Sequence, residues 1–99
     1  MSYYFIALIQ ITDSIEYQRY LDKAGEVFKK YNGKYIVLDD NPIILEGNWD
    51  YTRTIVIEFG SKNDFDDWYN SPEYQQILKF RLNGSTSNAI LAKGLDEIK

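Results

Sequence analysis

Hydrophobic and polar positions in this chain follow two periods, one of about two residues and one of about 3.6. The first stretch, Tyr3 to Ile11, is apolar or aromatic at every position except Gln10. Alternate residues of a strand face opposite sides of a sheet, so both faces of this strand need to be buried. The helices of so short a chain can cover one face. The pattern therefore predicts a homodimer that pairs through the other sheet face.

The first helix is predicted between Asp13 and Gly33. Apolar residues recur at helical spacing from Tyr17 to Tyr31, after an aspartate that suits the N-cap position. The pair Asn32-Gly33 is expected to end the helix, because these residues readily take a positive backbone φ.

Four further strands or strand-like segments are predicted from period-two alternation between turn residues. The four segments span residues 34–38, 43–46, 52–59 and 86–93. A turn at residues 39–42 is expected to lead into the second of them, residues 43–46, which is a short strand or an extension of the strand before it.

Two more helices are predicted before the last strand. Ser61 suits the N-cap of the first, which is short. Ser71 suits the N-cap of the second, and Pro72 suits its first helical position, where no backbone N–H is needed. Asn83-Gly84 is expected to end it.

The order of elements indicates an α+β fold of the ferredoxin-like βαββαβ type, with an antiparallel sheet and helices on one face. We predict a single domain over residues 1–99, since a chain of this length makes one domain. With the first strand apolar on both faces, two such sheets are expected to pack face to face as a dimeric α/β barrel.

The amino-acid composition limits the partners and the kinds of catalysis that this protein can use. Eleven basic and fifteen acidic residues give a net charge of −4, which predicts that nucleic acid is not a partner. The chain has no cysteine and no histidine, which excludes thiolate and histidine chemistry, so we expect neither a metal nor a cofactor. The longest apolar run, about nine residues, is far short of a membrane span and lacks signal-peptide flanks. We expect a cytoplasmic protein with no membrane partner.

Several segments resemble a family of bacterial proteins catalogued as domain of unknown function 1330. The segments are Leu-Glu-Gly-Asn-Trp at residues 45–49, the strand from Arg53 to Phe59, Trp-Tyr-Asn-Ser-Pro-Glu-Tyr-Gln at residues 68–75, and Arg81. The resemblance implies the dimeric α/β-barrel superfamily, which includes cofactor-free monooxygenases, lactone isomerases, haem-dependent enzymes and stress-responsive domains. It transfers no catalytic residue. The lack of histidine makes the haem-dependent branch a poor comparison.

Two arginines are candidate ligand-binding residues. Arg53 begins a strand face that is otherwise apolar, so its guanidinium is expected at one end of the sheet, where it would bind a small carboxylate or phosphate. The alternative is an ion pair with one of the nearby carboxylates, Glu46, Asp50 or Glu73. Arg81 lies among apolar helix positions, and its alternative role is to extend its charged end to solvent.

Aromatic and acidic residues supply the other candidates. Trp49 and Trp68 would wall a ligand pocket, or else pack in the core. Glu58 and Tyr69 are the candidate catalytic residues, with Glu58 as a general base if a partner chain buries it and as a structural carboxylate otherwise.

Two function hypotheses remain open. One is a cofactor-independent enzyme, monooxygenase-like or isomerase-like, that acts on a small aromatic or carboxylate-bearing molecule. The other is a non-catalytic homodimer that binds a small ligand or takes part in a stress response. A carboxylate or tyrosine with a shifted pKa beside Arg53 in one cavity would favour the enzyme.

Overall fold

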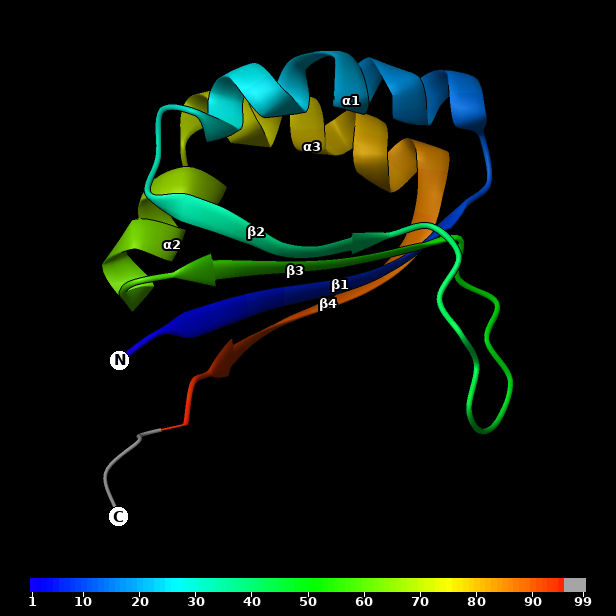
Figure 1. The fold of residues 1–99 in the computed structure, drawn as a ribbon. Helices are drawn as coiled ribbons and strands as arrows, with labels where there is room; N and C mark the ends of the chain where they lie inside the picture. Colours follow the sequence, from blue (N-terminus) through cyan, green and yellow to red (C-terminus); the bar gives the residue numbers. More distant parts are fainter. Residues whose placement is uncertain (96–99) are drawn as a thin grey trace.

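A computed structural model describes residues 1–95 and shows the predicted order of elements (Figure 1). The fold is ferredoxin-like α+β, with three helices and a four-stranded antiparallel sheet. None of the helices in this described part is long and apolar enough to cross a membrane. The predicted domain also includes residues 96–99, which lie outside the described residues. The elements are β1 (Tyr3–Ile11), α1 (Ser14–Phe28), β2 (Gly33–Asp39), β3 (Arg53–Phe59), α2 (Lys62–Tyr69), α3 (Pro72–Gly84) and β4 (Ser85–Lys93).

The strand order β2-β3-β1-β4 places the doubly apolar β1 in the middle of the sheet. Helices α1 and α3 lie over one face of the sheet (Figure 1), and Phe5, Ala7 and Ile9 of β1 are buried beneath the helices. On the opposite face, Ile6 lies between Val56 of β3 and Ile90 of β4. No helix within residues 1–95 covers this second face, which we call the outer sheet face.

The core between helices and sheet is rich in aromatic rings. The Trp68 ring packs at 5.5 Å from the Phe59 ring and at 4.3 Å from the Tyr74 ring, measured between centroids. Such contacts join α2 and α3 to the sheet and bury large apolar areas. The rings do not fill all of the volume between α1 and the strands. A cavity remains there, and it is described below.

The segment predicted as a strand over residues 43–46 is not a strand. Residues 40–52 form an irregular loop that projects away from the helices (Figure 1), and Ile43 and Leu45 are exposed. The chain leaves the sheet where the Asp39 side chain accepts a hydrogen bond from the Asn41 backbone N–H. Pro42 follows at once. An apolar alternation makes a strand only where a neighbouring strand can pair with it, and the described residues offer none here.

The first helix ends earlier than predicted, and for a different reason. Helix α1 stops at Phe28, and neither Asn32 nor Gly33 has a positive φ. A Cβ atom at Gly33 would lie 2.7 Å from carbons of the Phe28 and Phe59 rings, so glycine is needed here for close packing. Gly84, at the end of α3, has the same role. A Cβ there would lie 2.6 Å from the backbone nitrogen of Tyr17.

The N-caps are as predicted. Asp13, Ser61 and Ser71 each accept a hydrogen bond from a backbone N–H in the first turn of their helix. The Glu16 side chain, three residues after Asp13, forms an ion pair with Arg19 on the same helix.

Replacing Ser71 with alanine is expected to lower the free energy of unfolding by about 1–2 kcal/mol. The buried Ser71 hydroxyl accepts from the Tyr74 N–H at 3.0 Å and donates to the Trp68 carbonyl at 2.9 Å, so two hydrogen bonds are lost. Urea denaturation measures the change, with Ser61→Ala, a more exposed cap, as the control. A loss of ligand binding at unchanged stability would contradict this structural role.

Candidate functional site

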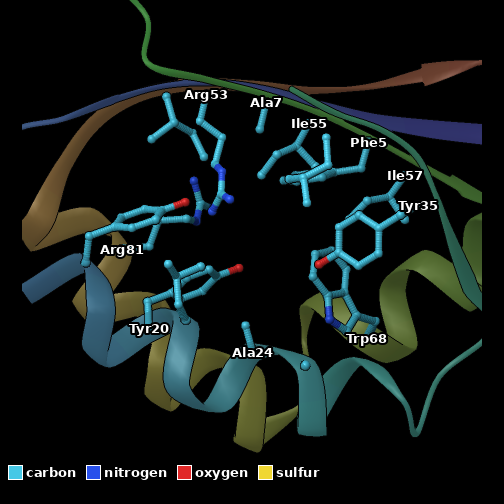
Figure 2. Close-up of a pocket in the computed structure, with 15 residues that line it drawn as sticks. Phe5, Ala7, Tyr20, Ala24, Tyr35, Arg53, Ile55, Ile57, Trp68 and Arg81 are labelled. Carbon is cyan, nitrogen blue, oxygen red and sulfur yellow. The ribbon is translucent and has the colours of Figure 1, made fainter. Parts of the chain in front are cut away.

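A cavity of about 140 Å³ lies between helix α1 and the sheet (Figure 2). Its walls come from every element except β4, and most of them are apolar. An apolar cavity of about 150 Å³ in another protein binds benzene, so this cavity accommodates about one aromatic ring. The size is that of a small-molecule site.

Two arginines from distant parts of the chain meet at this cavity. Arg53 is the first residue of β3, on the face that also carries Ile55 and Ile57. Arg81 lies in the last turn of α3 and is only 3% exposed. Figure 2 shows the two arginines on the same side of the cavity, and Trp68 on the opposite side. The cavity therefore has a cationic end and an aromatic end.

Arg53 has one carboxylate partner, although not one of the three considered from the sequence. Its Nε donates to Asp40 Oδ1 at 2.9 Å, and no other carboxylate in residues 1–95 forms an ion pair with it. Burial works to lower the pKa of Arg53, but the nearby Tyr17 and Asp40 outweigh it and raise that pKa. Arg53 stays charged, with its terminal nitrogens available to a ligand.

Arg81 has no carboxylate partner among the described residues. Its Nη1 donates to the Ser87 hydroxyl at 3.2 Å, while its Nε is buried without a partner. Burial works to lower the pKa of Arg81, but Tyr74 and Tyr20 outweigh it and raise that pKa, so the guanidinium keeps its charge. A buried cation with no anion beside it is unfavourable, and an anionic ligand would relieve this cost.

Tyrosines complete the polar part of the wall. The hydroxyls of Tyr20 and Tyr74 lie 2.8 Å apart, and burial, followed by the influence of Tyr74, raises the pKa of Tyr20 well above its usual value. Burial also raises the pKa of Tyr35. Tyr20 and Tyr35, two of the three tyrosines that line the cavity, therefore stay protonated at neutral pH. They can donate a hydrogen bond to a ligand, but they are weak candidates for a general base.

Buried polar atoms without partners gather at this cavity. Within the described chain, the buried side-chain atoms that lack a hydrogen bond are Tyr17 Oη, Thr54 Oγ1, Trp68 Nε1 and Arg81 Nε. All but Thr54 belong to residues that line the cavity. Because buried polar groups in proteins are nearly always paired, this concentration makes the cavity a candidate ligand site.

Three of the residues singled out from the sequence lie elsewhere. Glu58 is on the outer sheet face, where it accepts hydrogen bonds from the hydroxyls of Ser2 at 2.7 Å and Tyr4 at 3.3 Å. Trp49 lies in the 40–52 loop, with its ring 5.1 Å from that of Tyr51. Tyr69 packs its ring against Phe65 and does not line the cavity. The structure brings together Arg53, Arg81 and Trp68.

The tyrosines of the cavity were missed by sequence reasoning as site residues. Tyr17 and Tyr20 were assigned to the apolar stripe of the first helix, and Tyr35 to a strand. A signal was available, since two hydroxyl-bearing residues three positions apart on the buried face of a helix must place their polar ends inside the fold.

The sequence matches the family model described as "Domain of unknown function (DUF1330)" over residues 2–95, nearly the whole chain. The chain belongs to the DUF1330 family. The suspected resemblance is thus confirmed. This DUF1330 protein matches no curated protein.

Solved structures share the fold of this DUF1330 protein. A protein of unknown function from Rhodopseudomonas palustris, RPA0582, is 20% identical over 96% of this chain and 83% of its own, with a TM-score of 0.78. SnoaB, a cofactor-independent oxygenase from Streptomyces nogalater, is 12% identical over 98% of this chain and 96% of its own, with a TM-score of 0.67. A dimeric ferredoxin-like protein of unknown function from Jannaschia sp. CCS1 is 9% identical over 95% of this chain and 100% of its own, with a TM-score of 0.71.

Proposed function

We propose that this protein binds a small aromatic molecule bearing a carboxylate or another anionic group in the helix-side cavity, and acts on it without a cofactor. The observation that carries the proposal is the buried Arg81, which has no carboxylate partner in the described chain and lies with Arg53 at one end of an aromatic cavity. Guanidinium groups bind carboxylates through two parallel hydrogen bonds, and the aromatic wall would hold the ring.

The chemistry we propose is monooxygenase-like or isomerase-like. Two cations in a largely apolar cavity stabilise negative charge that develops on a bound substrate, for example an enolate or phenolate. Since Tyr20 and Tyr35 stay protonated, they would donate hydrogen bonds to that anion. The substrate itself must then be acidic enough to lose its proton to solvent water. The shared fold with SnoaB supports this class by analogy only.

A non-catalytic binding protein is the second candidate, and one observation favours it. No aspartate or glutamate lines the cavity within residues 1–95, because Glu58 lies on the outer sheet face and Asp40 is paired with Arg53. A site without a general base can still hold an anionic ring. Binding and turnover must therefore be measured separately.

The test is a thermal-shift screen with benzoate, salicylate, hydroxyquinones and small lactones. A ligand that binds only the folded state raises the melting temperature whether or not it reacts. Compounds that bind are then followed by oxygen consumption and by NMR for isomerisation. Turnover supports the enzyme, whereas binding without turnover supports the second candidate. If none of the anionic rings binds, the proposal is wrong.

Replacing Arg53 with lysine is expected to weaken benzoate binding about tenfold, although the charge is kept. A compact ammonium cannot reproduce the two parallel hydrogen bonds of a guanidinium to a carboxylate. Isothermal titration calorimetry measures the affinity, and Arg19→Lys, at an exposed arginine outside the cavity, is the matched control. Equal affinity in Arg53→Lys and the natural protein would remove Arg53 from the site.

We also propose that the protein is a homodimer joined through the outer sheet face. The face carries Tyr4, Ile6 and Leu8 of β1 beside Val56 and Ile90, and no helix of the described part of the chain covers it. An apolar face of this kind is usually a protein interface. The dimeric ferredoxin-like protein from Jannaschia sp. CCS1 supports the same arrangement.

A further inference from the structure

Exposure changes from one part of the cavity wall to another. Tyr17, Arg81 and Ile9 are almost completely buried. In contrast, Leu38 is 56% exposed, Tyr35 is 45% exposed and Leu21 is 36% exposed, although all three line the same cavity. The cationic end is therefore deep, and the wall that reaches solvent is made of apolar and aromatic side chains.

The solvent-facing part of the wall lies between helix α1 and strand β2. Leu21 and Gly25 come from α1, and Tyr35 and Leu38 come from β2, which is an edge strand of the sheet. Within residues 1–95, no further strand lies beyond β2 to close this side. We call the gap bounded by these four residues the α1–β2 opening.

Gly25 is the unexpected residue at this opening. A glycine in the interior of a helix destabilises it by about 1 kcal/mol relative to alanine, so its presence calls for a reason. Packing is not the reason, because a Cβ atom at Gly25 would have no neighbour within 4 Å, unlike those at Gly33 and Gly84. Backbone conformation is not the reason either, since its φ is not positive. What the missing side chain leaves is clear space at the α1–β2 opening.

We propose that the ligand is an elongated amphipathic acid, whose anionic group lies at Arg53 and Arg81 and whose apolar tail leaves through the α1–β2 opening past Gly25. This inference rests on the proposed function and specifies the class of its ligand. A cavity that holds about one ring cannot enclose a longer molecule. The tail must be apolar, because the side chains at the opening are Leu21, Tyr35 and Leu38.

The experiment compares benzoate with 4-butylbenzoate, which adds four apolar carbons opposite the carboxylate. Each buried methylene strengthens binding severalfold, so the natural protein is expected to bind 4-butylbenzoate at least tenfold more tightly than benzoate. In Gly25→Leu, a side chain fills the opening. We expect this variant to weaken the binding of 4-butylbenzoate at least tenfold more than it weakens the binding of benzoate.

Two matched variants distinguish a side chain that blocks the α1–β2 opening from a substitution that changes helix α1 in general. Glu26→Leu adds the same side chain to α1 at an exposed position that does not line the cavity, and is expected to leave the preference for 4-butylbenzoate intact. Gly25→Ala tests helix propensity alone, and a higher melting temperature with little loss of 4-butylbenzoate binding is expected. Melting curves of all variants establish that they are folded.

The outcomes distinguish this inference from the proposed function. If the natural protein binds benzoate but binds 4-butylbenzoate no more tightly, or if Gly25→Leu weakens both acids equally, the elongated ligand and the α1–β2 opening are wrong while the anion site stands. If neither acid binds the natural protein, the proposed function fails and this inference fails with it.

Discussion

Replacing Arg81 with methionine is expected to weaken the binding of benzoate by at least about 30-fold without unfolding the protein. Removing one partner of a buried, hydrogen-bonded charge pair costs about 2–5 kcal/mol of binding free energy. Arg81 is buried and has no carboxylate partner in the described chain, so a bound carboxylate would be its only close anion. Calorimetric titration with benzoate measures the loss.

Stability provides the control for Arg81→Met. Methionine has a similar length and fills irregular apolar space, and replacing a buried charge by an apolar side chain is often neutral or stabilising. We therefore expect a melting temperature equal to or above that of the natural protein. Arg19→Met, at an arginine whose guanidinium packs over the Phe80 ring, should bind benzoate normally. A large drop in the melting temperature of Arg81→Met would show that Arg81 is structural.

If the protein is the homodimer proposed above, replacing Ile6 with lysine is expected to convert it into a monomer at micromolar concentration. Ile6 lies at the middle of the outer sheet face, between Val56 and Ile90. Two-fold symmetry brings the substitution into the interface twice, and each buried, unpaired ammonium costs several kcal/mol. Light scattering after size-exclusion chromatography measures the mass.

The matched control introduces the same charge away from the sheet. Ile15→Lys changes an exposed position of helix α1 and should leave the dimer intact. A natural protein that is monomeric at micromolar concentration would refute the homodimer. An Ile6→Lys variant that stays dimeric would place the interface elsewhere.

The short-range features of this fold were predictable from the sequence. N-caps at Asp13, Ser61 and Ser71 depend on a side chain and a backbone N–H three residues away, so the sequence specifies them directly. The length of the first strand follows from an apolar run interrupted only by Gln10, and the ferredoxin-like class follows from the order of elements. Local chemistry was sufficient for each of these.

Errors arose where a distant partner decided the outcome. The apolar alternation of residues 43–46 suits a strand, but the chain had already turned out of the sheet near Asp39. Gly33 and Gly84 were assigned to helix ends with positive φ. Both are instead required by contacts with other elements, namely the Phe28 and Phe59 rings and the backbone at Tyr17.

The candidate site also has features that follow from the sequence alone and features that depend on contacts between distant residues. The sequence alone determined that Arg53 begins an otherwise apolar strand face, that Arg81 lies among apolar helix positions, and that β1 is apolar on both faces. Only the tertiary structure decided that the two arginines meet at one cavity, that Tyr20 lies beside them and that Trp49 and Glu58 do not. The physical reason is that periodicity assigns a residue to a face of its own element. Which faces meet depends on strand register and on how the helices cross the sheet, and these are set by packing over the whole chain.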